Sequence, residues 1–275
     1  MPLGNAAPPR LIAVDLDGTL LDDRGRISQR NKAAIAAVRR RNCDVVIVTY
    51  RAYLSSKPYA RELGLHLPLL CCNGALVKDA TDDHVLESFP LTRAAATAAV
   101  EYGMANGFEQ CLYIGEHYIG HPAIVNKYGE QWRFQWEECD DLRERLHEPT
   151  LMVRYFIDEH VGARVARDLD HLGVEHVADR FGDSVQVTLM QKGVSKRSAL
   201  ERFARDLGIE RRDVIALGDG ALDAGMLAYA GHGIAMANAH PAALAAADEV
   251  TSSNEDDGVA IALERLFALS PPTNR

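Results

Sequence analysis

The sequence predicts an α/β protein whose parallel sheet is built from both ends of the chain, with an α+β domain inserted between them. Short apolar runs that end in polar residues alternate with helical segments in residues 1–80 and again in 192–275, which is typical of a parallel sheet covered by helices. Residues 81–191 instead contain runs that suit antiparallel strands. We therefore expect 1–80 and 192–275 to form one core and 81–191 to form a separate domain.

The first strand is predicted over 11–14, an apolar run that polar residues bound on both sides. Such a run suits a strand that is buried on both faces of a parallel sheet. Two aspartates, Asp15 and Asp17, follow at its carboxyl end. Ser28 has the chemistry of an N-cap, and apolar residues are interleaved with polar and basic ones over 29–40, so a helix is expected there.

A second buried strand is predicted over 45–48, and it ends at Thr49. A helical segment follows over 52–63, where Pro58 is expected to interrupt the helix because it has no backbone N–H to donate. The apolar run 67–72 is predicted as a third strand. The order to this point is strand, helix, strand, helix, strand.

The inserted range has a different pattern. Strands are predicted over 152–157 and 184–189, and helices over 94–104 and 161–172. Residues 180–183 have turn chemistry between two strand-like runs. This mixture is what we expect of an α+β domain.

The parallel-sheet pattern returns at Lys196, where a helix is predicted to begin and to end near Gly208. The strand after it, 213–218, is again followed by an aspartate, Asp219. The remaining predicted elements are a helix over 222–230, a strand over 233–236, a helix in the alanine-rich stretch 239–247 and a final helix over 258–269.

The composition is that of an ordinary globular protein, with 275 residues of which 47% are hydrophobic and 25% charged. The net charge of -9 gives no general attraction to nucleic acid or to an anionic bilayer, so neither is expected as a partner. The five cysteines form no recognisable disulfide or zinc pattern, and neither a secretion signal nor a run of ~18 apolar residues is visible. We expect a cytoplasmic protein, and the sequence leaves its oligomeric state open.

Candidate site residues lie at the predicted carboxyl ends of three strands. Ligands of open parallel sheets bind in the crevice beyond these ends, so Asp15, Asp17, Thr49 and Asp219 are expected to converge. Three carboxylates brought together repel one another unless a cation compensates them. Mg²⁺ suits this role because it prefers hard oxygen ligands and commonly takes only a couple of carboxylates, with water and phosphate as its other ligands.

In this hypothesis, Asp15 and Asp219 each give a carboxylate oxygen to Mg²⁺, and Asp17 gives its backbone carbonyl. The Asp17 side chain then stays free for proton transfer. Gly18 and Thr19 would let the chain turn sharply after Asp15, so that their backbone N–H groups face an anion.

A bound phosphate group would also need neutral donors and a positive charge. Thr49 can supply the first, and a lysine from 192–196 can supply the second. The substrate class that fits these groups is a small phosphorylated metabolite.

The run DLDGTLL at 15–21 resembles the first motif of the haloacid dehalogenase superfamily of phosphohydrolases, and nearly the whole chain is similar to its Cof-type branch. The resemblance implies a Rossmann-like parallel-sheet core and a large inserted α+β cap. It also implies that Asp15 forms an aspartyl-phosphate, while Asp17 acts first as general acid and then as general base.

Thr49 matches the phosphate-binding threonine of the family's second motif, and residues 73–75, Asn-Gly-Ala, resemble the step that precedes the cap. The resemblance thereby places Asn73 at the phosphate and substrate site. The second motif usually continues with glycine, whereas Tyr50 stands here. Its backbone N–H is still expected to donate to phosphate.

Residues 193–196 resemble the third motif, which implies that Lys196 neutralises charge on the nucleophile and the phosphate. The fourth motif is matched by Asp219, as a metal ligand, and by Asp223, as a ligand or as a residue that supports one. An asparagine usually precedes the second aspartate of this motif. Leu222 stands there instead and cannot hydrogen-bond a neighbouring ligand or a phosphate oxygen.

These features predict a Mg²⁺-dependent phosphatase that hydrolyses small phosphate monoesters, with sugar phosphates as the first expected class, through an aspartyl-phosphate on Asp15. Two alternatives stay open. A phosphosugar mutase would use the same acid-base chemistry at Asp17 but protect the phosphoenzyme from water, and a non-catalytic binding or regulatory protein would retain only the scaffold. Carbon–halogen hydrolysis is disfavoured, because it needs neither Asp17 nor a metal ligand such as Asp219.

Overall fold

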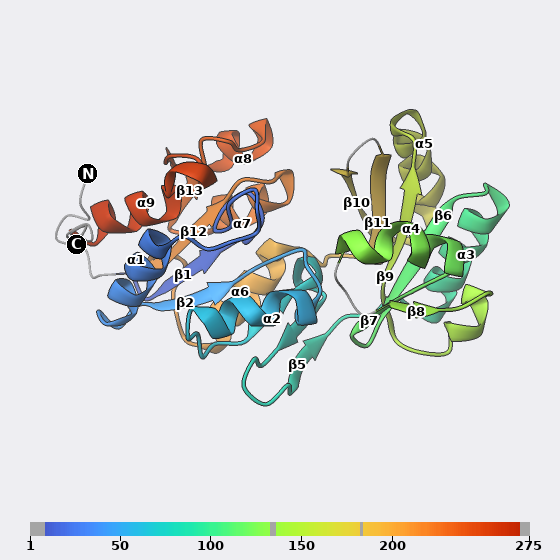
Figure 1. Ribbon diagram of the computed structural model, residues 1–275, viewed down its shortest axis with the longest axis horizontal. Helices are drawn as coiled ribbons and strands as arrows, with labels where there is room; N and C mark the ends of the chain where they lie inside the picture. Colours follow the sequence, from blue (N-terminus) through green and yellow to red (C-terminus); the bar gives the residue numbers. More distant parts are fainter. Residues whose placement is uncertain (1–8, 133–135, 182–183, 270–275) are drawn as a thin grey trace. The chain divides into compact units, whose positions relative to one another are not determined.

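The computed structural model describes residues 9–132, 136–181 and 184–269. The chain divides into two compact units (Figure 1). The core unit comprises Met1–Arg51, Ser56–Leu86 and Ser195–Arg275, and the inserted unit comprises Ala52–Ser55 and Glu87–Val194. Both ends of the chain therefore belong to the same unit.

The core unit contains the predicted parallel sheet, in the strand order β14-β13-β12-β1-β2. Its neighbouring strands are parallel, and Leu11 of β1 lies opposite Asp44 of β2 and Val214 of β12. The carboxyl ends of β1, β2 and β12 thus emerge at the same edge, which confirms the α/β fold class. These strands span Leu11–Val14 (β1), Asp44–Ile47 (β2), Val214–Gly218 (β12), His232–Ala235 (β13) and Glu249–Val250 (β14).

The first helices of the core unit follow the sequence closely, with one exception. Ser28 Oγ accepts the backbone N–H of Asn31 at 3.0 Å, and α1 runs over Gln29–Arg39. The expected interruption at Pro58 is wrong, because α2 continues through it over Tyr53–Glu62; a proline inside a helix removes one backbone donor, and here the helix tolerates that loss. Further helices are α6 (Lys196–Asp206), α7 (Ala224–Tyr229), α8 (Pro241–Ala246) and α9 (Gly258–Leu266).

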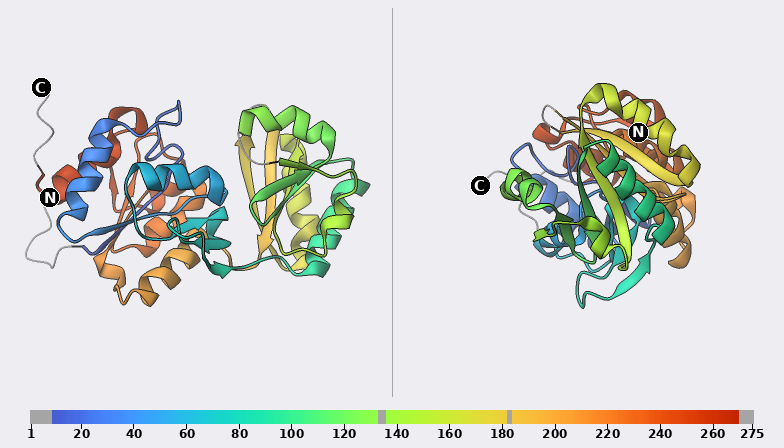
Figure 2. Two further views of the ribbon diagram at one scale, coloured as in Figure 1. Left: turned by 60° about the horizontal axis from the view of Figure 1, so that its bottom comes forward. Right: turned by 90° about the vertical axis from the view of Figure 1, so that its right-hand side faces the viewer.

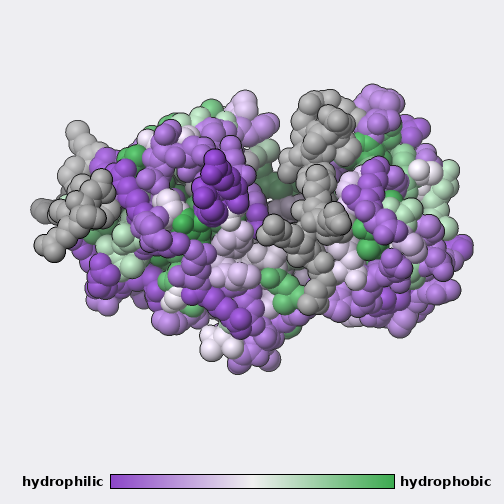
Figure 3. Space-filling view, in the orientation of Figure 1, coloured by the Kyte–Doolittle hydropathy of each residue, from purple (hydrophilic) through white to green (hydrophobic). Residues whose placement is uncertain are grey.

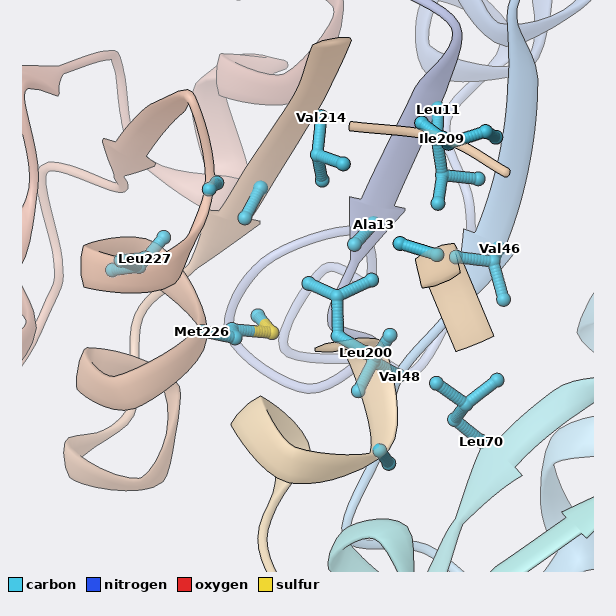
Figure 4. Packing of buried hydrophobic residues seen from close by; sticks show 14 of the residues in the cluster. Leu11, Ala13, Val46, Val48, Leu70, Leu200, Ile209, Val214, Met226 and Leu227 are labelled. Carbon is cyan, nitrogen blue, oxygen red and sulfur yellow. The ribbon is translucent and has the colours of Figure 1, made fainter. Parts of the chain in front are cut away.

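A cluster of buried apolar side chains joins one face of the parallel sheet to α6 and α7 (Figure 4). Leu11 contributes to it from β1, and Leu200 and Met226 contribute from the two helices. On the other face lie α1 and α9 (Figure 2), which are joined by a hydrogen bond from the Ala260 N–H to Asn31 Oδ1 at 2.9 Å. Because β1 is buried on both faces, the residues that follow it are held at a fixed place on the sheet edge.

A tight turn follows the third predicted strand. Of the run 67–72, only Leu69–Cys71 (β3) forms a strand. Leu70 forms a bridge with Val48, the residue after β2, and β3 pairs antiparallel with β4 (Leu76–Lys78). The turn between them has three successive residues with positive φ, at 53°, 56° and 94° for Cys72, Asn73 and Gly74. Non-glycine residues rarely adopt this conformation, so the turn is strained. The edge strand β5 covers Val85–Ser88.

The inserted unit is a six-stranded sheet in the order β10-β11-β9-β6-β7-β8, in which β7 and β8 are parallel and the other pairs are antiparallel. Ala99 of α3 and Val165 of α5 pack on one face of this sheet with Val153 of β9. The helices are α3 (Arg93–Ala105), α4 (Pro122–Trp132) and α5 (Glu159–Leu169); the strands are β6 (Glu109–Ile114), β7 (His117–Gly120), β8 (Trp136–Glu138), β9 (Thr150–Ile157), β10 (Val174–Phe181) and β11 (Ser184–Gln191).

The α+β character predicted for this range is confirmed. The expected turn at 180–183 falls partly on residues 182–183, which lie outside the described residues, while 180 and 181 complete β10.

The surface of each unit is mainly polar on the face shown in Figure 3, where hydrophobic side chains occur in small separate groups. In the described ranges, no helix is long and apolar enough to cross a membrane. All five cysteines belong to those ranges and are free thiols. Burial raises the pKa of Cys43, Cys71 and Cys111 to about 12, so these three side chains are neutral and act as apolar packing groups.

Candidate active site

The predicted site residues at the ends of β1 and β12 lie next to each other. Asp15 directly follows β1, and its backbone N–H donates to the carbonyl of Leu217 in β12 at 3.1 Å. Asp219 directly follows β12. Neighbouring parallel strands therefore deliver two carboxylates to one place, as the order of elements predicts.

Lys196 is enclosed between carboxylates. Its side chain is 2% exposed, and Nζ lies 2.9 Å from Asp15 Oδ1 and donates to Asp223 Oδ1 at 2.6 Å. It occupies the first position of α6, where Ser195 and Ser198 form a reciprocal capping box. The cap fixes the start of the helix, and the helix start fixes the lysine beside the nucleophile candidate.

Asp223 is held on both of its oxygens by donors from the protein. Oδ1 accepts from Lys196, and Oδ2 accepts the backbone N–H groups of Asp219 at 3.1 Å and Gly220 at 2.8 Å. Leu222, in the neighbouring position, is half-buried. The backbone N–H groups of Asp219 and Gly220 thus fix the orientation of Asp223, and the same two bonds connect Asp223 to the loop that carries Asp219.

Asp219 is fixed from the other side by the turn after β1. Thr19 Oγ1 donates to Asp219 Oδ1 at 2.6 Å. Gly18 has a φ of +69°, and a Cβ at this position would lie 2.2 Å from Asp219 Oδ2. Only glycine fits between the two loops, so the predicted sharp turn is found and it brings backbone against a carboxylate.

Among the described residues, the carboxylates of Asp15, Asp219 and Asp223 form a cluster whose ligand atoms lie within 4.8 Å of one another. Burial raises the pKa of Asp15 well above its ordinary value, and Asp223 raises it further against the opposing effect of Lys196. Burial also raises the pKa of Asp219 to about 6. A single lysine does not balance this cluster, and a hard oxygen set with an excess of negative charge fits Mg²⁺.

We expect Mg²⁺ to stabilise the folded protein more at pH 7.5 than at pH 5. Without metal, the raised pKa of Asp219 favours folding at low pH, and this contribution is lost as pH rises through about 6. A pKa of about 6 for Asp219, compared with its ordinary value of 3.8, corresponds to roughly 3 kcal/mol in the free energy of unfolding. The cation relieves this penalty at pH 7.5 and competes with protons at pH 5.

Thermal denaturation with and without Mg²⁺ at both pH values measures this difference, with Asp219→Asn as the matched variant. The Mg²⁺-induced rise in Tm should be small in that variant at either pH. A rise of equal size at both pH values in the unchanged protein would contradict the expectation.

The Asp17 side chain is not free, contrary to the hypothesis from the sequence. It is more than half exposed, and Arg51 binds both of its oxygens, with Nε donating to Oδ2 at 2.6 Å and Nη2 contacting Oδ1. Arg51 is itself held by Tyr59, whose hydroxyl it contacts through Nη1 at 3.3 Å and whose ring lies 5.3 Å from the guanidinium. The pairing is bidentate, so it fixes the orientation of the carboxylate.

Thr49 and Asn73 are buried and linked through the backbone. The Thr49 hydroxyl accepts the Arg51 N–H at 3.1 Å, and the Asn73 N–H donates to the Thr49 carbonyl at 3.0 Å. Asn73 is 2% exposed, and its Oδ1 atom makes no hydrogen bond. Tyr50 is half-buried between these residues in the chain. Buried polar atoms without partners are uncommon, so Asn73 has unused hydrogen-bonding capacity at this loop.

Sequence reasoning gave no role to Arg51 or to the Thr19 hydroxyl, although both interact directly with candidate site residues. Arg51 was recognisable as the third residue of the second motif, two positions after Thr49. The partner of Arg51 could not be read from the sequence, because Asp17 lies on the loop after a different strand.

Comparisons with known proteins cover nearly the whole chain. The family model for haloacid dehalogenase-like hydrolases matches residues 12–263. The pyridoxal phosphate phosphatase YbhA of Escherichia coli (strain K12) is 28% identical over 266 residues, which cover 91% of this chain and 96% of that protein. The 5-amino-6-(5-phospho-D-ribitylamino)uracil phosphatase YitU of Bacillus subtilis (strain 168) is 29% identical over 280 residues, which cover 95% and 98%.

A solved structure gives the same result for the fold. The crystal structure of a haloacid dehalogenase-like hydrolase from Bacteroides thetaiotaomicron matches with a TM-score of 0.81 at 25% sequence identity, covering 94% of this chain and 99% of that chain. The similarity therefore includes the core unit and the inserted unit alike.

Proposed function

The chain belongs to the haloacid dehalogenase-like hydrolase family and is a phosphatase, and from this premise we propose that it hydrolyses small phosphate monoesters with Mg²⁺ through an aspartyl-phosphate on Asp15. The main support is the buried contact of Lys196 Nζ with Asp15 Oδ1 at 2.9 Å, beside Asp219 and Asp223. A carboxylate nucleophile that approaches an anionic phosphate needs positive charge at its side, and this lysine provides it.

In the first step, one Asp15 carboxylate oxygen attacks phosphorus and the bond from phosphorus to the substrate's ester oxygen breaks. Asp17 gives its proton to that oxygen, which leaves as an alcohol. Arg51 donates to both carboxylate oxygens of Asp17, so one of these two contacts has to loosen when a proton is placed on that oxygen.

In the second step, the Asp17 carboxylate takes a proton from water, and the resulting hydroxide attacks the phosphorus of the aspartyl-phosphate. The bond between phosphorus and Asp15 breaks, which releases phosphate and restores the Asp15 carboxylate. Lys196 Nζ contacts Asp15 Oδ1. It stabilises the negative charge of the Asp15 carboxylate before the first step and again when the second step restores this carboxylate.

Mg²⁺, held by the Asp15 and Asp219 carboxylates and the Asp17 carbonyl, would supply charge neutralisation at the phosphoryl oxygens. Asp223 would orient the Asp219 loop through its backbone contacts. The phosphoryl oxygens would also meet donors from the core unit, namely the Thr49 hydroxyl, the Asn73 amide and the backbone N–H groups of Gly18 and Tyr50.

For the substrate, we propose a small phosphorylated metabolite handled in the cytoplasm. Sugar phosphates are the first class that the family resemblance suggests. The two similar phosphatases are named for pyridoxal phosphate and for a phosphoribitylaminouracil, so phosphate esters with a heterocycle belong in the same test. The free thiols suit a reducing compartment.

A panel of sugar phosphates, nucleotides and cofactor phosphates, assayed for phosphate release with Mg²⁺ and with EDTA, tests the proposal. We expect release that depends on Mg²⁺ from at least one ester. An isomeric sugar phosphate with little free phosphate would favour the mutase instead. Binding without turnover on every ester would favour a non-catalytic protein.

An Asp17→Asn variant should show that the two steps can be separated. With p-nitrophenyl phosphate, whose leaving group needs no proton, we expect a rapid burst of nitrophenolate followed by turnover that is slower by about 10²- to 10⁴-fold. The reason is that the first step survives, whereas the water in the second step loses its base. Stopped-flow absorbance measures the burst of nitrophenolate. With a phosphate ester of an alkyl alcohol, samples quenched at early times should contain no burst of released alcohol.

The matched control is Asp206→Asn, which changes an exposed aspartate at the end of α6. It should behave like the unchanged protein. If Asp17→Asn keeps full steady-state turnover on alkyl phosphates, the acid-base role assigned to Asp17 is wrong.

A further inference from the structure

We propose that Asn238 is a positioning residue that sets the separation of the two loops carrying Asp15 and Asp219. The inference rests on the proposed function, since it concerns the geometry of the same carboxylates. Asn238 follows β13, the strand next to β12, and so lies in a third loop at the same edge of the sheet. Neither Asn238 nor this loop has a role in the chemistry described so far.

The first contact of Asn238 is with the turn after β1. Its Nδ2 atom donates to the backbone carbonyl of Gly18 at 2.8 Å. Gly18 is the residue that lies against the Asp219 carboxylate, and the adjacent Thr19 donates its hydroxyl proton to the same carboxylate. The orientation of this turn therefore decides where Asp219 meets the Asp15 loop.

The loop of Asn238 also binds the end of β12 directly. The N–H of Met236 donates to the carbonyl of Gly218 at 3.1 Å, and the N–H of His240 donates to the carbonyl of Asp219 at 2.7 Å. Residues 236–240 thus hold the β12 loop through two backbone bonds and hold the β1 turn through one side chain. Of these three bonds, only the one from Asn238 depends on the identity of a side chain.

A second asparagine completes the connection. Asn238 Oδ1 accepts the N–H of Asn254 at 3.0 Å, so the amide is fixed at both ends and its orientation is set. Asn254 donates from Nδ2 to the carbonyl of Leu21 at 3.0 Å and to Asp23 Oδ1 at 3.2 Å. The turn after β1 is therefore held near its beginning by Asn238 and at its far end by Asn254.

The Asn238 side chain is exposed, so its removal leaves no cavity in the core. Its loss frees the Gly18 carbonyl and lets the turn shift relative to Asp219. A displacement of about 1 Å in a catalytic arrangement can cost about 10²-fold in rate, even when the replaced residue does not touch the substrate. Residues that orient metal ligands typically affect metal affinity or activity by about 10- to 100-fold.

The test compares Asn238→Ala and Asn238→Asp with the unchanged protein. Asn238→Asp keeps an acceptor for Asn254 but places an oxygen against the Gly18 carbonyl. Both variants should lower kcat by about 10- to 100-fold with KM changed by less than about 3-fold. Asn238→Ala should also weaken Mg²⁺ binding by about 10-fold, measured by calorimetry without substrate.

Asn106→Asp is the matched control, because Asn106 Nδ2 also donates to a backbone carbonyl, that of Tyr102, at 2.9 Å, but in the inserted unit. It should change neither kcat nor Mg²⁺ affinity. Unchanged kcat and Mg²⁺ affinity in both Asn238 variants would overturn the positioning role, and so would a lower metal-free Tm with unaltered Mg²⁺ affinity. Weaker Mg²⁺ binding in Asn238→Ala, in a protein that hydrolyses no ester, would uphold the positioning role and reject the phosphatase mechanism.

Discussion

An Asp15→Asn protein is expected to fold normally and to lose at least about 10⁴-fold of its phosphatase kcat/KM, as when other covalent nucleophiles are removed. The amide cannot form the acyl phosphate, and it also withdraws one of the carboxylates that Mg²⁺ would bind. Phosphate release from the best ester of the panel measures the loss. Circular dichroism and thermal denaturation check that the variant is folded.

Asp206→Asn serves again as the control for the aspartate-to-asparagine change, since it alters an exposed charge on the same unit. Trapping of labelled phosphate in acid-quenched protein gives a second readout, because it should succeed with the unchanged protein and fail with Asp15→Asn. If the correctly folded variant retains the original rate, another group is the nucleophile.

Replacing Lys196 by methionine is expected to reduce kcat by about 10³-fold and to destabilise the metal-free fold at pH 7.5 by about 3–5 kcal/mol. Methionine fills similar space but leaves the buried Asp15 and Asp223 without their shared cation. The loss of stability should shrink as pH falls, because burial raises the pKa of Asp15 and its protonation removes the repulsion from Asp223. Urea unfolding at pH 7.5 and pH 5 measures the loss of stability, and phosphate release measures the loss of kcat.

Lys192→Met is the matched control, because Lys192 is exposed and belongs to the same short segment that the sequence suggested for the phosphate-binding lysine. Its stability and its kcat should stay close to those of the unchanged protein. The reverse outcome, a large loss in Lys192→Met with little change in Lys196→Met, would exchange the roles of the two lysines.

The placement of the site could be predicted from the sequence because it depends on strand order and on residues that directly follow strands. Asp15 and Asp219 each come immediately after a buried apolar run, and parallel neighbours must bring such residues together. Backbone direction alone was sufficient for these two residues. For the lysine, the residues left the segment 192–196 open, and the resemblance of 193–196 to the third motif of the family singled out Lys196.

Side-chain partners could not be predicted in this way. Asp17 is paired with Arg51, a residue from the loop after the next strand, and only the folded sheet brings the two within hydrogen-bonding distance. The strained turn at 72–74 could not be predicted either, because the positive φ angles of Cys72 and Asn73 go against local preference. Such angles persist only where the surrounding structure imposes them. The unbroken helix through Pro58 likewise goes against a local preference.

The strand order also fixes when the site can form during synthesis. β1 is central in the sheet, and one of its two neighbours, β12, is made about 200 residues after it, once the inserted unit has been translated. β12 begins about 170 residues after the end of β2, so at about 5–20 residues per second roughly 8–33 s remain in which β1 can pair with β2 alone. Asp15 therefore acquires its contact with Lys196 and its neighbours Asp219 and Asp223 only after the last third of the chain has been made.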